Sequence, residues 1–175
     1  MKSNTKMTFR QSINRLLAVA TLSLAASGAS AENLVPLSYQ CLQQVSQKYG
    51  IHMDVFFAIL MVEGGTVGQN NKGNTNGTYD IGPFQINSMH LPWLNDMGIT
   101  ETQLRNNGCV NANVAAMLIQ RSVMNERVLS TITDGRTYLA ALARYHSATP
   151  VHNERYAGLL ANAFNRLQAA SGGVQ

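Results

Sequence analysis

The chain has few of the residues that stiffen or cross-link small domains. It contains two cysteines, four prolines and one tryptophan in 175 residues, so at most one disulfide can form within it. Its clearest apolar run, Leu16 to Ala26, covers eleven positions, whereas a membrane-spanning helix needs roughly 20. We therefore expect no stable membrane span.

Basic runs are also missing from most of the chain. Four of the thirteen basic residues lie within the first 31 positions, which leaves nine against nine acidic residues in the remainder. The formal charge of +4 therefore belongs to the N-terminal segment, and residues 32–175 are close to neutral. Because nucleic-acid binding requires a basic face, we expect no nucleic-acid partner.

The N-terminal segment has the pattern of a cleavable secretory signal. Basic residues come first, an apolar run follows, and the segment ends in the small residues Ala29-Ser30-Ala31. Cleavage after Ala31 would leave residues 32–175, a length that suits a single domain with one core. We predict a signal peptide over residues 1–31, one domain over residues 32–175, and a periplasmic location.

Cys41 and Cys109 are the two cysteines of the chain, which we expect to be exported. An oxidising compartment favours a disulfide between them. The alternative is a pair of buried free thiols. Metal binding by this pair is less favoured because no CxxC spacing is present.

Apolar periodicity predicts a mainly helical α+β domain with a small loop-and-hairpin lobe. Gly, Asn and Thr dominate residues 66–80, where Asn76-Gly77 is the strongest hairpin signal. Asp54 is the predicted cap of the second helix, which is apolar on every side and ends at Glu63. The expected helices are residues 37–49, 55–63, 111–127, 138–145 and a last one after Pro150, with short turns at 91–94 and 100–104 and short strands at 79–81 and 84–86.

Glu63 is the candidate general acid. It is a charged residue at the end of an apolar helix, where burial raises the pKa of a carboxyl group. The partial negative charge of a helix C-terminus acts in the same direction. A carboxyl that stays protonated near neutral pH can protonate a glycosidic oxygen. The alternative is that Glu63 points into solvent.

Glu63 and the downstream stretch Tyr79-Asp80-Ile81-Gly82-Pro83-Phe84-Gln85-Ile86-Asn87-Ser88 resemble the signatures of the lytic transglycosylases with a goose-type-lysozyme fold. Order and spacing make this resemblance specific. It continues through Cys109-Val110-Asn111, Arg144-Tyr145-His146-Ser147 and Tyr156-Ala157, and so covers nearly all of residues 37–165. The chain looks most similar to the small members of this SLT-domain family that are attached to secretion, conjugation or pilus systems.

The resemblance implies a lysozyme-like fold and a role for several residues. Glu63 takes the place of the catalytic glutamate, Gln85 lines the sugar cleft, and Tyr145 hydrogen-bonds near the glutamate. Asn87 and Tyr156 are supporting residues. Without the resemblance, both tyrosines would be interpreted as core aromatics. The chain departs from the family pattern at Gly64, at Pro83-Phe84 and at His146.

Two possible metal sites fit poorly. His146, His152 and Glu154 do not form an HExxH motif, and their spacing does not suit one helix face. An alignment of residues 72–83 with a calcium loop puts Lys72 and Pro83 where carboxylates are needed. We expect neither a metal nor another cofactor.

Ordinary glycosidases use two carboxylates, one on each side of the scissile bond. Only Asp80 lies close to the motif in sequence, and nothing spaces it as an obvious partner for Glu63. The resemblance implies a lytic transglycosylase that cleaves the glycan strands of peptidoglycan and leaves 1,6-anhydro-muramic ends. The alternatives are a hydrolytic muramidase that uses Asp80 or a positioned water, and a non-catalytic peptidoglycan-binding assembly protein.

Overall fold

A computed structural model of the chain describes residues 33–172, and the signal peptide predicted over residues 1–31 lies outside them. All the described residues belong to one compact unit. Within this part of the chain, no helix has the length and apolar character needed to cross a membrane.

Helices dominate the unit, and a single two-stranded antiparallel sheet occurs among the described residues, which confirms the predicted fold class. Asp80 pairs with Asn87 in this sheet, and Ile81 pairs with Ile86. The elements, in chain order, are α1 (Tyr39–Tyr49), α2 (Met53–Glu63), β1 (Asp80–Ile81), β2 (Ile86–Asn87), η1 (Ser88–His90), α3 (Leu91–Asp96), α4 (Glu101–Asn106), α5 (Gly108–Ser122), α6 (Glu126–Leu129), α7 (Gly135–Leu142), η2 (Ala143–Tyr145) and α8 (Pro150–Gly172).

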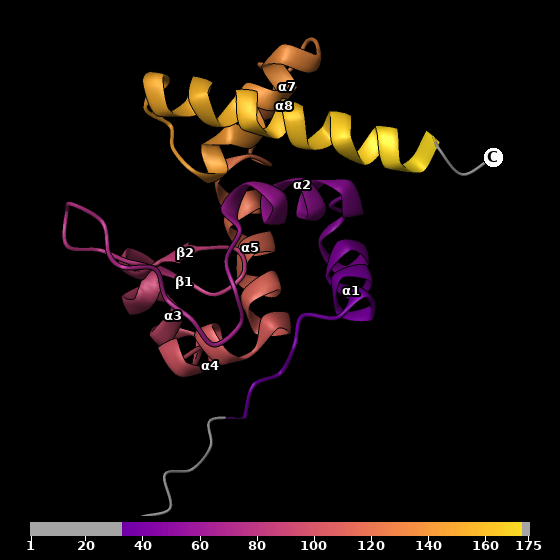
Figure 1. Cartoon of the computed structure of the whole chain (residues 1–175). Helices are drawn as coiled ribbons and strands as arrows, with labels where there is room; N and C mark the ends of the chain where they lie inside the picture. The colour runs from indigo at the N-terminus through magenta and orange to yellow at the C-terminus, as the bar shows by residue number, and fades with distance from the viewer. Residues whose placement is uncertain (1–32, 173–175) are drawn as a thin grey trace, which may run out of the picture. The chain divides into compact units, whose positions relative to one another are not determined.

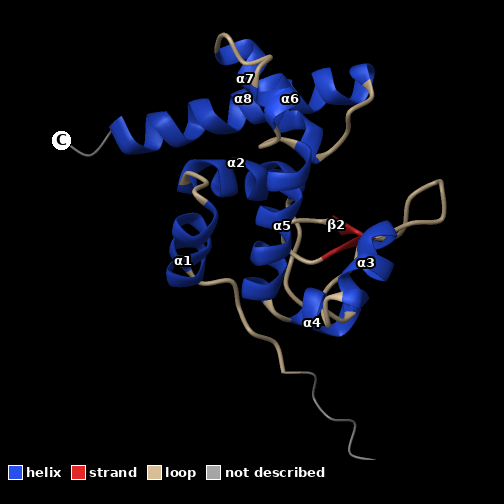
Figure 2. Ribbon diagram, turned by 180° about the vertical axis from the view of Figure 1, so that it is seen from behind, coloured by secondary structure: helices blue, strands red, loops and turns tan. Residues whose placement is uncertain are grey.

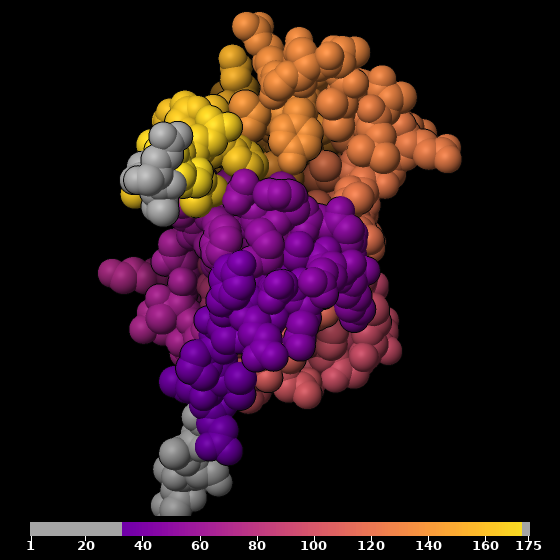
Figure 3. Space-filling view, turned by 90° about the vertical axis from the view of Figure 1, so that its right-hand side faces the viewer, coloured from indigo at the N-terminus to yellow at the C-terminus, as the bar shows by residue number. Residues whose placement is uncertain are grey.

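Helix α2 lies at the centre of the unit, beneath α8 and beside α1 and α5 (Figure 1). Its side chains Phe56, Ala58 and Ile59 are fully buried, as expected for a helix that is apolar on every side. The space-filling view shows its atoms packed directly against those of α8 (Figure 3). This packing fixes the position of Glu63, the last residue of α2.

The two strands, η1, α3 and α4 form a small lobe on the side of α5 away from α1 (Figures 1 and 2). The strands are joined through residues 82–85, and Asn76-Gly77 lies in the preceding loop. That loop is closed at its base by a bridge between Asn70 and Ile81. The hairpin signal therefore marks a turn that is separate from the connection between the two strands.

The prediction of a strand over residues 84–86 was wrong for Phe84 and Gln85, which lie in the turn before β2. Gly82 (φ 69°) and Gln85 (φ 49°) both adopt left-handed backbone conformations. Two such residues within four positions reverse the chain instead of extending it. The apolar character of this stretch comes from burial of the turn.

Helix starts also differ from the predictions, because capping side chains set them. The first helix begins at Tyr39, after Ser38, whose side chain accepts a hydrogen bond from the backbone N–H of Cys41. Asp54 is not the cap of α2, because the His52 side chain accepts from the N–H of Asp54 instead. Capping of this kind satisfies backbone N–H groups that have no partner within the helix.

The long helix predicted over residues 111–127 is two helices. Asn107 accepts from the backbone N–H groups of Cys109 and Val110, so α5 starts earlier than expected. Asn125 caps α6 by accepting from Val128, and this separates residues 126–129 from α5. Helix α7 likewise starts early, at Gly135, through a capping box between Asp134 and Thr137.

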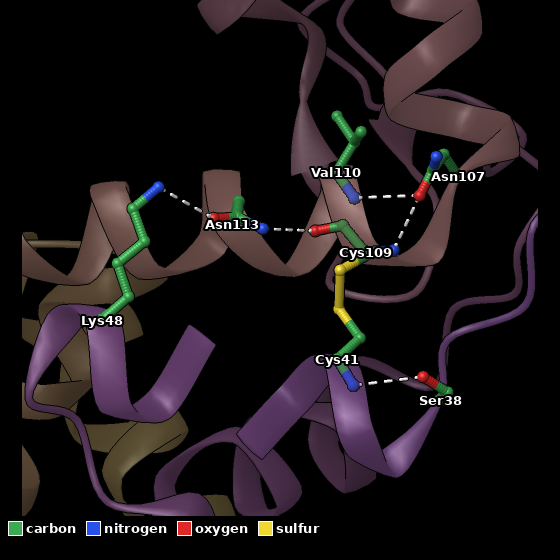
Figure 4. Close-up of a disulfide and its surroundings, with 7 residues drawn as sticks. All are labelled: Ser38, Cys41, Lys48, Asn107, Cys109, Val110 and Asn113. Atoms are coloured by element: carbon green, nitrogen blue, oxygen red, sulfur yellow. Dashed lines mark hydrogen bonds between the residues drawn. A yellow bond between two sulfur atoms is a disulfide. The ribbon is translucent and has the colours of Figure 1, made fainter. Parts of the chain in front are cut away.

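Cys41 and Cys109 form the predicted disulfide, with their Cα atoms 5.7 Å apart. Each lies in the first turn of its helix, so the bond joins α1 to α5 (Figure 4). A hydrogen bond of 3.4 Å from Lys48 Nζ to Asn113 Oδ1 connects the same two helices farther along. The two helices beside α2 are therefore tied to each other covalently.

Candidate active site

A pocket of about 520 Å³ lies between α2, the small lobe and the segment that leads into α8. Four of the predicted site residues line it: Glu63, Gln85, Asn87 and Tyr145. The fifth, Tyr156, is buried behind the pocket wall and contacts Glu63. The other lining residues are Asn74, Thr75, Asn76, Asp80, Ile86, Met89, His90, Leu118, His146, Ser147 and His152.

Glu63 reaches the pocket from the C-terminal end of α2. Gly64 ends the helix in a left-handed conformation, and its N–H donates to the Leu60 carbonyl. Burial raises the pKa of the Glu63 carboxyl from 4.5 to about 7; a hydrogen bond from Tyr156 lowers it in part, and the nearby Asp80 charge raises it. A carboxyl with this pKa exists in both protonation states near neutral pH, so it can serve as acid and as base.

Tyr156 is the direct hydrogen-bond partner of Glu63. Its hydroxyl donates to Glu63 Oε1 at 2.6 Å, across 93 positions of sequence. Burial and the Glu63 charge raise the pKa of Tyr156 far above 10, so the hydroxyl remains a donor. The imidazole of His146 stacks parallel to the Tyr156 ring, with centroids 4.7 Å apart, and restricts its rotation.

Tyr145 acts on the turn between the strands. Its hydroxyl donates to the Phe84 carbonyl at 2.8 Å rather than to Glu63. Burial, followed by the Glu63 and Asp80 charges, raises the pKa of Tyr145 well above 10. Tyr145 therefore anchors the backbone next to Gln85, while Tyr156 contacts the acid.

Gln85 adopts the left-handed conformation that L-residues with a Cβ disfavour, with φ at 49°. Its Nε2 donates to the Gly82 carbonyl at 2.8 Å, which closes the turn. A non-glycine residue in this conformation next to a catalytic candidate suggests strain that is retained for function. The sequence resemblance led to Gln85, but the strain could not be inferred from it.

Gly65 allows the turn to approach the end of α2. A Cβ atom at this position would lie 2.1 Å from the Gly82 carbonyl oxygen and 2.5 Å from Gln85 Nε2. Any larger residue would separate the two segments. The sequence analysis assigned no role to Gly65.

Asn111 is a buried residue that holds the turn from below, and sequence reasoning assigned it no role. Its Nδ2 donates to the carbonyls of Ile81 (2.9 Å) and Leu104 (3.0 Å), and its Oδ1 accepts from the Phe84 N–H (2.9 Å). The side chain is fully buried, so these backbone groups have no access to solvent. In the sequence, a polar residue at a core-facing position of α5 could have indicated this role.

Asp80 organises the loop that forms one wall of the pocket. Its Oδ2 accepts from the side-chain amides of Asn71 (2.6 Å) and Asn74 (3.2 Å), and its Oδ1 accepts from Asn87 (2.8 Å). Asn87 also donates to Thr78 at 3.0 Å. The carboxylate thus ties together three amides that come from the loop and from β2.

Comparison with known proteins agrees with this geometry. Residues 40–150 match the family model described as Transglycosylase SLT domain. The chain belongs to this family. The matched range of the SLT domain runs from α1 to the first residue of α8, and it includes Glu63, Gln85, Asn87 and Tyr145.

Several curated proteins are similar to part of this SLT-domain chain. "Invasion protein IagB" of Salmonella typhimurium (strain SL1344) is 34% identical over 83 residues, which cover 45% of this chain and 49% of the relative. "Protein IpgF" of Shigella flexneri is 31% identical over 84 residues, 48% and 55% of the two chains. A "Peptidoglycan-binding-like protein" of Escherichia coli O157:H7 is 30% identical over 91 residues, 48% and 54%. The chain spans about half the length of these relatives.

The described part of this SLT domain contains no cluster of metal-binding side chains. Within residues 33–172, no three His, Cys, Asp or Glu side chains are grouped so that they could hold an ion. His146 and His152 both line the pocket, but Glu154 is not among its lining residues. Burial, followed by the His152 charge, lowers the pKa of His146, which favours the neutral ring that stacks on Tyr156.

Proposed function

We propose that the protein is a lytic transglycosylase that cleaves the bond between N-acetylmuramic acid and N-acetylglucosamine in peptidoglycan. The observation that carries this proposal is the partly buried Glu63 carboxyl, which lines the pocket and accepts a hydrogen bond from Tyr156, and whose pKa burial raises to about 7. Membership of the SLT family supports the same substrate class.

In the proposed reaction, protonated Glu63 donates its proton to the glycosidic oxygen as the bond from that oxygen to C1 of the muramic residue breaks. The N-acetyl group of the same residue stabilises the positive charge that develops at C1. The Glu63 carboxylate then takes the proton of the 6-hydroxyl, and O6 bonds to C1. The reaction consumes no water, and its product is a 1,6-anhydro ring.

Gln85 and Asn87 are the proposed glycan contacts, because both line the pocket on the lobe side of Glu63. Tyr156 positions the acid, and Tyr145 positions the turn that carries Gln85. This division of roles follows from the hydrogen bonds that each hydroxyl donates. It gives the two tyrosines distinct functions.

We also propose that the enzyme acts in the periplasm and opens the wall locally for a secretion, conjugation or pilus apparatus. The predicted signal peptide and the disulfide suit an oxidising compartment outside the cytoplasm. The name of one relative, an invasion protein, is in keeping with this role. Residues 32–175 form the proposed enzyme domain.

A hydrolytic muramidase is the second candidate, because Asp80 lines the same pocket as Glu63. Three side-chain amides already donate to the Asp80 carboxylate, which is the arrangement of a structural anchor. A base that activates water needs an oxygen open to that water. The amide contacts therefore favour the transglycosylase.

The test is release of soluble fragments from purified peptidoglycan by the wild-type protein and by Glu63→Gln. Gln keeps the size of the side chain but has no titrating proton, so cleavage should fall by about 10²- to 10⁴-fold. Glu154→Gln is the matched control, since Glu154 is exposed on α8. A folded Glu63→Gln protein with wild-type cleavage would overturn the proposal. Binding without cleavage by the wild type would favour a non-catalytic peptidoglycan-binding protein.

A further inference from the structure

Arg121 lies in the last turn of α5, and the proposed chemistry does not use it. Leu118, three residues earlier on the same helix, lines the pocket. Residues three apart lie on one face of a helix, so Arg121 is placed next to the pocket wall. Its side chain is exposed.

The guanidinium of Arg121 is held in place by an aromatic ring. It lies over the indole of Trp93 in α3, 4.3 Å from the ring centroid. Stacking of this kind orders an arginine without using its N–H donors. The same indole forms a T-shaped pair with the ring of His90, at 6.5 Å between centroids, and His90 lines the pocket. Trp93 therefore connects the arginine to the η1 side of the pocket.

The N–H donors of the Arg121 guanidinium have no acceptor among the residues that the structure describes. Among residues 33–172, its guanidinium forms no ion pair and donates no hydrogen bond. A planar fork of N–H groups on a fixed support suits a carboxylate, which it can bind through two parallel hydrogen bonds. The pocket itself contains the carboxyl groups of Glu63 and Asp80, so an anionic group of the substrate is better placed at the rim.

We propose that Arg121, supported by Trp93, is a binding site for a carboxylate carried by the muramic acid residues of the glycan. This inference rests on the proposed function, because it assumes a peptidoglycan strand in the pocket. Two substituents supply that chemistry: the peptide stem, and the lactyl group once the stem has been removed. The stem is the expected source, because it projects from the glycan and a receptor at the rim can reach it.

The test measures binding of three soluble glycan preparations to a Glu63→Gln protein, which leaves the strands uncut. The first preparation carries peptide stems. The second has been stripped by an amidase and carries free lactyl carboxylates. In the third, the lactyl groups of stripped strands have been converted to neutral methyl amides. Arg121→Gln is then added to the Glu63→Gln background, because Gln keeps a planar end that can stack on Trp93 but carries no charge.

We expect Arg121→Gln to weaken binding of the stem-bearing strands by about fivefold, the upper range for an exposed charge pair. Binding of the neutral strands should change by less than about twofold. The difference should shrink at high salt, because salt screens exposed charges. Arg127→Gln, a change of an exposed arginine on α6 outside the pocket lining, should leave all three affinities unchanged.

A loss confined to stripped strands would assign the lactyl carboxylate as the ligand and keep the site. If Arg121→Gln weakens binding of all three preparations equally, Arg121 acts only on the fold and the site is overturned. The site is also overturned if Arg121→Gln weakens binding of none of them, or if the strands do not bind at all. Arg121→Lys should restore part of the affinity if charge is what binds. Strands that bind through Arg121 but are not cut by the wild-type protein would refute the proposed function and leave this site intact.

Discussion

Ionisation of the Glu63 carboxyl costs free energy in the folded protein. Burial is the main reason why its pKa is raised from 4.5 to about 7, so the folded state disfavours the ionised carboxylate. At a pH between these two pKa values, the folded state binds more protons than the unfolded state. The stability contributed by protonated Glu63 is therefore present below about pH 4.5 and is lost as the pH rises through about 7.

Glu63→Gln should remove this dependence on pH. Above pH 7 the variant should be more stable than the wild type by on the order of 3 kcal/mol, while at pH 4 the two should be equal. Denaturant unfolding at both pH values measures the difference. Glu154→Gln, at an exposed position, should show no such crossover. Equal stability of wild type and Glu63→Gln at pH 8 would contradict the raised pKa.

Gln85 combines backbone strain with a side chain in the pocket, and two substitutions separate these effects. Gln85→Ala removes the side chain but keeps the Cβ at a φ of 49°, whereas Gln85→Gly removes both. The Gly variant should therefore be more stable than the Ala variant by about 1 kcal/mol. Both should cleave peptidoglycan more slowly. Equal unfolding free energies for the two variants would show that the conformation is not strained.

At the scale of elements, the pocket depends on the buried anchor beneath the turn that joins β1 and β2. Asn111 satisfies three backbone groups on Ile81, Phe84 and Leu104. Asn111→Ala leaves all three without a partner in the core, and we expect a loss of about 3 kcal/mol in unfolding free energy. The loss is measured by denaturant unfolding.

Asn113→Ala is the control on the same helix. Asn113 is only partly buried, and its amide donates to the Cys109 carbonyl within α5. Its removal should cost well under 1 kcal/mol, since solvent can replace the lost contacts. Similar losses for the two variants would show that the turn does not depend on Asn111.

Periodicity predicted that the helices exist, and it placed the ends of α1 and α2 correctly at Tyr49 and Glu63, but it did not predict where the helices start. The apolar pattern of α2 is unambiguous, yet its cap is His52 rather than the expected Asp54. Phe84 and Gln85 have the apolar and polar alternation of a strand, but their backbone forms a turn because tertiary contacts from Asn111 and Tyr145 hold it there. Such contacts join positions 27 and 61 residues apart, beyond the reach of local patterns.

Four of the five proposed site residues line one pocket, so their proximity could be predicted, mainly through the family resemblance, but their contacts could not. Tyr145 was the tyrosine expected near the glutamate, yet it is Tyr156 that donates to Glu63. Which hydroxyl reaches the acid depends on how α8 packs along α2. That packing follows from the whole core, so motif spacing alone does not reveal it.

In the molecule as a whole, the candidate active site is assembled by packing of distant segments on α2. The disulfide stabilises this arrangement by tying α1 to α5 across 68 positions of sequence. A cross-link over a loop of this length contributes about 4 kcal/mol in the chain-entropy account. The site itself lies elsewhere, because neither cysteine lines the pocket.

The double substitution of Cys41→Ala with Cys109→Ala should therefore lower the unfolding free energy by about 2–4 kcal/mol. Cleavage by the fraction that remains folded at low temperature should be unchanged. Denaturant unfolding and fragment release measure the two properties. The wild type under reducing conditions should behave like the variant, and a stability unaffected by reduction would contradict this role.

We propose that Glu63 acts alone as acid and base, with the 6-hydroxyl of the sugar as the nucleophile. Digestion of peptidoglycan in ¹⁸O-labelled water tests it directly, because only hydrolysis places a water oxygen at the new end. Asp80→Asn is a necessary companion, although it can also slow cleavage by loosening the loop that Asp80 anchors. We predict unlabelled 1,6-anhydro-muramic ends from both proteins. Labelled reducing ends as the main wild-type product, lost on Asp80→Asn, would contradict the claim and identify a muramidase.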